Sequence, residues 1–179
     1  MFLKYAMMRE VSSPDRHNPT DAGIDFFMPK MTPEFISYYN TLAKNNKTRI
    51  TNLPDGIMKL YIPPGASALI PSGIKVEIPY GFMGLFCNKS GVASKLSLMI
   101  GAQVIDTFYS GEVHIDLHNV GTEIVELAED AKLAQMTLVP ALNVDLTLVE
   151  EEDLYDWMHQ NQTRGERGFG SSNEKANTQ

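Results

Sequence analysis

Residues 61–86 read YIPPGASALIPSGIKVEIPYGFMGLF, and this stretch decides the fold. Turn-forming pairs recur in it at residues 64–65, 72–73 and 80–81, and short apolar runs fill the intervals. Between the last two turns, residues 74–78 read IKVEI, so apolar and charged side chains alternate. Alternation broken by regular Pro and Gly turns is typical of antiparallel strands. The stretch therefore predicts an antiparallel sandwich or barrel.

The same alternation continues on the C-terminal side of this stretch. Residues 111–119, 132–140 and 144–149 are each predicted to form a strand, which makes the body of the protein all-β. Residues 32–46, TPEFISYYNTLAKNN, differ because they begin with a Thr-Pro-Glu helix start and place apolar residues at helical spacing. We expect a short amphipathic helix there, within an insertion that covers about residues 30–58.

Composition limits the classes of function. The 179 residues are 43% hydrophobic and 21% charged, with a formal net charge of −7 and a pI near 5.0. These values favour a folded domain and argue against a general nucleic-acid or membrane-surface binder. Cys87 is the single cysteine, and no signal peptide or membrane span is recognised in the sequence, so a reducing, cytoplasmic location is expected.

Four short segments carry candidate chemistry, and each has a plainer interpretation. Residues 164–172, RGERGFGSS, combine cations, an aromatic ring and glycines that suit a phosphate and a base, although a plain Gly/Ser tail is the alternative. In residues 87–95, CNKSGVASK, a strand end opens a helix where an anion could bind, or Ser90 simply caps that helix. Asp106 and Asp25 lie near glycines, where turn formation is the commoner role.

Taken in order, these segments resemble the five motifs of the trimeric dUTPase family. The matching segments are residues 21–27 (DAGIDFF), 88–95 (NKSGVASK), 101–119 (GAQVIDTFYSGEVHIDLHN), 131–140 (AKLAQMTLVP) and 164–172 (RGERGFGSS). The resemblance implies a jelly-roll β-barrel at residues 1–150, a flexible C-terminal arm at residues 151–179, and a homotrimer with shared active sites. It further implies hydrolysis of dUTP to dUMP and pyrophosphate with Mg²⁺ as cofactor.

The resemblance also assigns roles to the acidic and aromatic residues. Asp106 matches the acid that orients the attacking water, and Asp25 matches the acid that holds waters on a Mg²⁺ bound mainly by the triphosphate. Tyr109 matches the tyrosine under the deoxyribose. Backbone groups around Ile100 to Val104, including Gln103, would pair with uracil.

Phosphate binding is implied for a further set of residues, with an aromatic lid over the base. Phe169 matches the ring that stacks on uracil when the arm closes over the site. Three residues depart from the family pattern, because Lys89 and Lys132 stand where arginine is usual and Arg167 where glycine is usual. The implied phosphate-binding residues are Lys89, Ser90, Gly91, Gln135, Arg164, Gly170 and Ser171.

Alternatives stay open beside this interpretation. A dCTP deaminase has related motifs, but Asp106, Tyr109 and the Phe-containing tail argue against it. A regulatory protein could use Phe35, Tyr38 and Tyr39 of the insertion as a partner surface, although packing of these rings on the barrel is preferred. Residues 114–118 place two histidines and an aspartate on one strand face, which indicates a surface or interface more readily than a transition-metal site.

Overall fold

The computed structural model describes residues 2–43, 47–53 and 56–155. The chain divides into two compact units, Met1–Asn143 and Val144–Gln179, which are described separately. The first unit holds all the strands of the described residues and both α-helices. None of the helices in the described ranges is long and apolar enough to cross a membrane.

Residues 61–86 form the antiparallel strands that their sequence predicts. The turns at Gly65, Gly73 and Gly81 lie where expected, and each glycine has a positive φ, of 70°, 75° and 81°. This left-handed conformation is available to glycine at little cost, so the three glycines allow the chain to reverse sharply. The strands between them are β4 (Met58–Ile62), β5 (Ser67–Pro71), β6 (Ile74–Glu77) and β7 (Phe82–Cys87).

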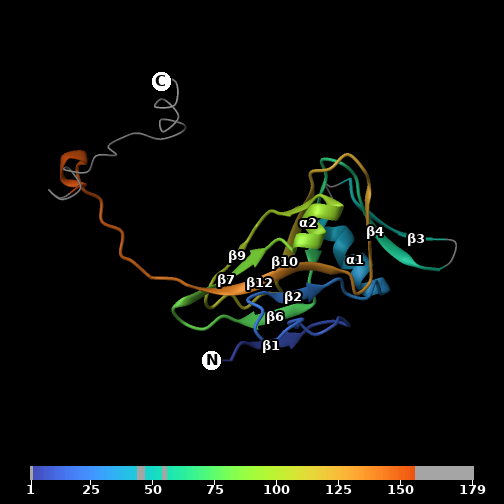
Figure 1. Cartoon of the computed structure of the whole chain (residues 1–179), viewed down its shortest axis with the longest axis horizontal. Helices are drawn as coiled ribbons and strands as arrows, with labels where there is room; N and C mark the ends of the chain where they lie inside the picture. Colours follow the sequence, from blue (N-terminus) through green and yellow to red (C-terminus); the bar gives the residue numbers. More distant parts are fainter. Residues whose placement is uncertain (1, 44–46, 54–55, 156–179) are drawn as a thin grey trace, which may run out of the picture. The chain divides into compact units, whose positions relative to one another are not determined.

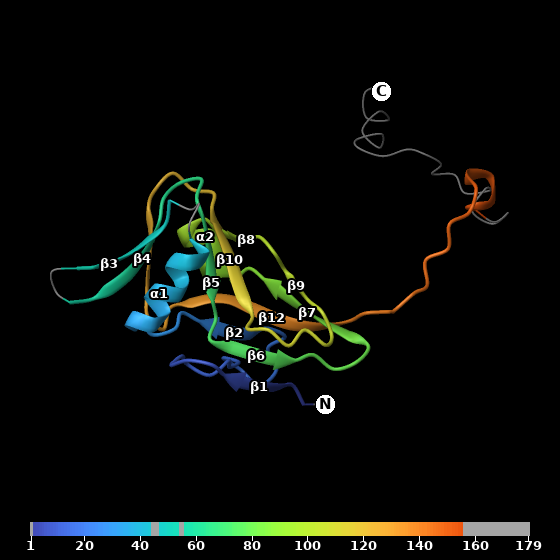
Figure 2. The same ribbon diagram turned by 180° about the vertical axis from the view of Figure 1, so that it is seen from behind.

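The described strands form four antiparallel sheets (Figures 1 and 2). Their orders are β1-β6, β5-β10-β8, β11-β4-β3 and β2-β12-β7-β9. The arrangement is of the jelly-roll type, although the strands of the described residues do not close into one hydrogen-bonded barrel. The remaining strands are β1 (Lys4–Met7), β2 (Ile24–Phe27), β3 (Arg49–Asn52), β8 (Leu98–Ile100), β9 (Val104–Ile105), β10 (His114–Asn119), β11 (Val125–Ala128) and β12 (Lys132–Pro140).

Alternation along the strands builds the core. In β6 the side chains of Ile74 and Val76 are buried, while Glu77 faces solvent. Phe26 of β2 and Phe86 of β7 meet edge to face inside the core, with ring centroids 5.0 Å apart. Because one face of each strand is committed to the core, the opposite face of β2, β12 and β7 is left to carry polar groups.

The insertion contributes one helix and one strand. Helix α1 (Pro33–Leu42) begins at the expected Thr-Pro-Glu start, where the Thr32 side chain accepts a hydrogen bond from the Phe35 N–H at 3.2 Å. Phe35 and Tyr39 are buried in the core, so these two rings pack inward rather than forming a partner surface. Strand β3, which was not predicted, pairs with β4 in a hairpin that extends away from the other strands in both views (Figures 1 and 2).

The strand predicted at residues 144–149 is absent from the described chain. Leu142, Val144, Leu146 and Leu148 alternate with polar residues as a strand would, but they are between 71% and 99% exposed and pair with no described strand. An alternating run becomes a strand only when a neighbouring strand supplies its hydrogen bonds. The prediction was therefore wrong for this chain, whose second unit has a short 3₁₀ turn, η1 (Glu151–Asp153).

Candidate active site

Side chains from three neighbouring strands, β2, β12 and β7, lie directly opposite one another in a sheet. Strand β12 lies between β2 and β7, and Gln135 is opposite both Asp25 and Cys87 in the register. Residues directly opposite one another in antiparallel strands share a face of the sheet. Asp25, Gln135 and Cys87 therefore lie side by side on the face turned away from the core.

A bulge in β12 adds a cation to this row. The register with β2 shifts between Lys132 and Ala134, so Lys132 stands opposite Phe27. Phe27 and Asp25 are two residues apart and share a face, which places Lys132 on the face of Asp25. The Lys132 ammonium lies 2.7 Å from one carboxylate oxygen of Asp25, and the Lys89 ammonium pairs with the other oxygen.

The two lysines determine the charge of Asp25. The carboxylate is 5% exposed, and burial alone would raise its pKa. Hydrogen bonds from Lys132 and Lys89, together with their positive charges, outweigh burial and hold the pKa of Asp25 below its ordinary value. Asp25 is consequently ionised at neutral pH, and the cluster of one carboxylate and two ammonium groups carries a net positive charge.

Asn88 connects strands β12 and β8, a role that the sequence pattern did not predict. Its backbone carbonyl accepts a hydrogen bond from Gln135 Nε2 at 2.9 Å, and its side-chain oxygen accepts one from the Ile100 N–H at 2.8 Å. A side chain at Gly23 would clash with the Gln135 amide, so glycine at this position lets Gln135 keep its hydrogen bond to Asn88. The position of Asn88 beside Lys89 was the only signal in the sequence.

Helix α2 (Ser90–Leu96) follows β7 directly, as predicted. Lys89 is its N-cap residue and makes no capping hydrogen bond, whereas Ser90 is the first helical residue. The alternative in which Ser90 caps the helix is therefore wrong. Ser90 and Gly91 are exposed beside the carboxylate cluster, and a side chain added at Gly91 would meet no described atom within 4 Å.

A cavity of about 350 Å³ opens onto this cluster. Asp25, Lys89 and Gln135 line it, so the structure brings together three of the predicted site residues from three different motifs. His17 and Cys87 line it as well, although neither was predicted as a site residue. Its lining is completed by Asp21, Ala22, Gly23 and Thr137.

The third motif, residues 101–119, contains strand β9, a turn and strand β10. Asp106 is exposed and begins a turn in which its carbonyl accepts a hydrogen bond from the Tyr109 N–H at 3.2 Å. Phe108, inside the turn, has a φ of 67° and is 84% exposed. Upstream, the Gln103 carbonyl accepts from the Phe86 N–H at 2.8 Å and the Gly101 N–H donates to the Asp116 carbonyl at 2.8 Å, so both groups are already used within the chain.

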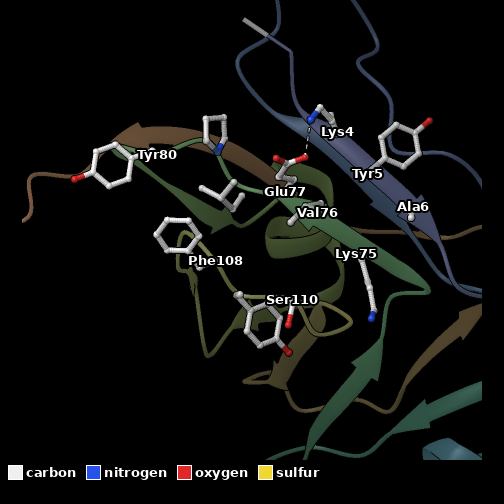
Figure 3. Close-up of a pocket in the computed structure, with 12 residues that line it drawn as sticks. Lys4, Tyr5, Ala6, Lys75, Val76, Glu77, Tyr80, Phe108 and Ser110 are labelled. Atoms are coloured by element: carbon white, nitrogen blue, oxygen red, sulfur yellow. Dashed lines mark ion pairs between the residues drawn. The ribbon is translucent and has the colours of Figure 1, made fainter.

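Tyr109 lines a second cavity, of about 570 Å³, rather than the cavity beside Asp25. Figure 3 is a close-up of this second cavity. The rings of Tyr80 and Phe108 border it with centroids 6.4 Å apart, and the exposed ion pair between Lys4 and Glu77 lies on its other side. Within the described chain, Asp106 and Tyr109 therefore do not share a cavity with Asp25. The predicted contacts Arg164, Phe169, Gly170 and Ser171 lie outside the described residues.

The two histidines of β10 have separate partners. His118 pairs with Asp116 at 2.9 Å, whereas His114 lies between the Glu112 carbonyl and the Tyr38 hydroxyl. Among the described residues, no group of three or more His, Cys, Asp or Glu side chains is placed to hold a metal ion. Asp25 fits a hydrated Mg²⁺ held by the triphosphate, because each of its oxygens accepts one lysine hydrogen bond and keeps a lone pair for a metal-bound water.

The chain is similar to known proteins in both sequence and fold. Residues 57–173 match the family model described as dUTPase. The deoxyuridine 5'-triphosphate nucleotidohydrolase of Escherichia phage T5 is 37% identical over 117 residues, covering 64% of this chain and 74% of that protein. A variant of the Staphylococcus bacteriophage 80alpha dUTPase, solved with dUpNHpp, has a similar fold, with a TM-score of 0.67, 24% identity, and coverage of 96% of this chain and 98% of that one.

A second similar structure coordinates a magnesium ion. A variant of the dUTPase from phage phi11 of S. aureus is 25% identical with a TM-score of 0.63, and the match covers 84% of this chain and 98% of that one. That protein coordinates a structural Mg(II) ion.

Proposed function

The chain belongs to the dUTPase family and is a dUTP diphosphatase, and from this premise we propose how its residues hydrolyse dUTP to dUMP and pyrophosphate. The observation that carries the proposal is the cavity beside Asp25. Lys89 and Lys132 pair with the single buried carboxylate of Asp25, and Lys89 and Gln135 line the cavity, where their ammonium and amide groups can bind a polyphosphate.

The phosphate chain binds at the start of α2. Lys89 supplies an ammonium group, Ser90 supplies a hydroxyl, and Gly91 lets the phosphate approach the backbone because no side chain intervenes. Gln135 reaches the same cavity from β12 and is held by Asn88. Arg164, Gly170 and Ser171 of the arm complete phosphate binding, and Arg167 adds a further cation.

Asp106 acts on the attacking water. An exposed carboxylate at the head of a turn can accept a proton from water and direct its oxygen at the α-phosphorus, in line with the leaving pyrophosphate. The lysines beside Asp25 face the charge that develops on the phosphates. When bound, Mg²⁺ supplies further neutralisation of that charge, with Asp25 accepting hydrogen bonds from its waters.

The segment of residues 100–104, which joins β8 to β9, binds the base, and Tyr109 contacts the sugar. The Ile100 and Gly101 N–H groups and the Gln103 carbonyl are already bonded inside the chain, so the remaining backbone groups of this segment pair with uracil. Tyr109 packs under the deoxyribose and excludes a 2′-hydroxyl. Phe169 stacks on the base when the arm closes, which removes water from the site.

A homotrimer joins the pieces of the site. Asp106 and Asp25 open onto different surroundings in one chain, and exposed rings of Tyr80 and Phe108 border the cavity that Tyr109 lines. Exposed aromatic clusters of this kind favour association. We place the segment of residues 100–109 of one subunit against the phosphate cavity of a second, with an arm closing over both.

Pyrophosphate release from dUTP, dCTP, dTTP and UTP, each with Mg²⁺ or with EDTA, tests the proposal. We expect metal-dependent turnover of dUTP alone. Turnover of UTP at a similar rate would contradict the role of Tyr109, and release of ammonia from dCTP would favour the deaminase alternative. Folded protein that turns over none of the four nucleotides would contradict the proposed mechanism.

A further inference from the structure

The structure anchors the Tyr109 side chain to Glu112, three residues further along the chain. The Tyr109 hydroxyl donates a hydrogen bond to the backbone carbonyl of Glu112 at 2.9 Å. A side chain at Gly111 would approach within 2.6 Å of the Tyr109 ring, so the ring lies back across the chain at this glycine. Because Tyr109 is 44% exposed, this one hydrogen bond and the contact with Gly111 fix its orientation.

Glu112 is itself held by several groups. Its carboxylate forms a two-point ion pair with Arg9, with N–O distances of 3.0 and 2.5 Å, and accepts a third hydrogen bond from the Gly73 N–H at 2.7 Å. The Glu112 side chain is 12% exposed and that of Arg9 22% exposed, so water competes little with the pair. Glu112, whose backbone carbonyl accepts the Tyr109 hydroxyl, is therefore fixed by Arg9 of the N-terminal segment and by Gly73 of the β5–β6 turn.

Helix α1 of the insertion contacts both Arg9 and His114, two side chains that bond to Glu112. The Arg9 guanidinium lies over the ring of Tyr38, 5.2 Å from its centroid, and 5.9 Å from that of Phe35. The Tyr38 hydroxyl lies 3.3 Å from His114 Nε2, while His114 Nδ1 lies 2.9 Å from the Glu112 carbonyl. Since a carbonyl only accepts, Nδ1 of His114 donates to the Glu112 carbonyl, and Nε2 is left to bond with the Tyr38 hydroxyl.

We propose that Glu112 is a positioning residue for Tyr109, and that the insertion helix sets the sugar selectivity of the enzyme through Arg9, Tyr38 and His114. This inference rests on the proposed role of Tyr109. A tyrosine excludes a 2′-hydroxyl only if its ring is held against displacement, and a loop with little packing cannot hold it alone. The insertion, by this argument, serves the active site of its own chain.

The test compares kcat/KM for dUTP and UTP in the full chain with Mg²⁺. In Glu112→Gln, the amide NH₂ group cannot accept a hydrogen bond from Arg9 or from the Gly73 N–H. At least one bond to the side chain of residue 112 is therefore lost, and the turn that carries its carbonyl is held less firmly. Tyr109→Phe removes the hydroxyl and keeps the ring. We expect each substitution to lower the dUTP-to-UTP ratio about fivefold, the value of one hydrogen bond. The control is Glu126→Gln, which changes an exposed acid on β11 in the same way and should preserve the ratio.

The double variant separates positioning from a general structural role. If Glu112 acts through Tyr109, adding Glu112→Gln to Tyr109→Phe lowers the ratio no further. Multiplying effects, or a Glu112→Gln ratio equal to that of Glu126→Gln, would overturn the inference. Should Glu112→Gln not fold, Tyr38→Phe removes a single hydroxyl from the same route and should lower the ratio about twofold; an unchanged ratio there would equally overturn it. Wild-type protein without dUTP turnover would defeat the proposed function, and this inference with it.

Discussion

A single buried carboxylate determines the electrostatics of the phosphate cavity. Asp25 receives Lys132 and Lys89 on its two oxygens, and this arrangement fixes both lysines beside the carboxylate. Lysine in place of the family's usual arginine loses the planar fork, but two point charges can meet one carboxylate, one from strand β12 and one from the start of α2. Two of the three departures noted in the sequence, Lys89 and Lys132, thus form one cluster.

The pKa of Asp25 makes the stability of this cluster dependent on pH. Because its folded pKa lies below the ordinary value of 3.8, the ionised carboxylate stabilises the fold above that value, and the contribution is lost as the pH falls through the folded pKa. At pH 7, Asp25→Asn should lower the free energy of unfolding by about 1–2 kcal/mol, since Lys132 is partly exposed. Urea unfolding between pH 7 and pH 3 should show this difference shrinking below about pH 4. A constant difference would contradict the assignment.

Asp106 carries the prediction about chemistry. Asp106→Asn keeps the size of the side chain and removes the basic carboxylate, so the protein should fold while kcat for dUTP falls about 10²- to 10⁴-fold. Thermal unfolding should be close to that of the wild type, because Asp106 is exposed. Glu123→Gln, an exposed acid in the turn before β11, serves as the control. Near-normal turnover by Asp106→Asn would remove Asp106 from the mechanism.

Residues of the site differ in whether their role can be predicted from the sequence. Asp25 and Gln135 could be named in advance because each stands in a recognisable motif, and the structure places both in one cavity. Asn88 could not, since its role depends on a backbone carbonyl meeting one strand and a side chain meeting another. Lys132 reaches Asp25 only because of a bulge, and nothing in an alternating pattern indicates where a register will shift.

At the scale of elements, helix α1 depends on its first turn. The Thr32 hydroxyl accepts the Phe35 N–H, and Phe35 is buried next to the cap. Thr32→Ala should therefore destabilise the protein by about 1 kcal/mol, measured by chemical unfolding. Ser37→Ala on the exposed side of the same helix should leave stability nearly unchanged. Equal effects of the two substitutions would show that the cap does not hold the helix.

Elements bounded by local signals were predictable, and elements that need a distant partner were not. A few adjacent residues determine the turns at Gly65, Gly73 and Gly81 and the start of α1. Strand β3 is short and largely exposed, and it exists because β4 offers an edge. Residues 144–149 show the converse. Their apolar and polar side chains alternate as in β10, but no described strand pairs with them.

For the whole molecule, the separation of Asp25 from Asp106 and Tyr109 leads to the last prediction. A site shared between subunits can be rebuilt from two inactive chains. Asp106→Asn keeps the arm but lacks the acid, and a chain truncated after Asn161 keeps the acid but lacks Arg164 and Phe169. Each protein alone should assemble as a trimer with little dUTPase activity.

Refolding the two inactive chains together distinguishes sharing from self-sufficiency. If the acid and the arm of one site come from different subunits, random mixed trimers should recover about one quarter of wild-type activity, because each of two independent choices succeeds half the time. Refolding a mixture of the wild type with the Asp106→Asn chain calibrates the yield of mixed trimers. If the arm serves the Asp106 of its own chain, every site in the mixture lacks one component and no activity returns. Full activity in the truncated chain alone would contradict the role of the arm altogether.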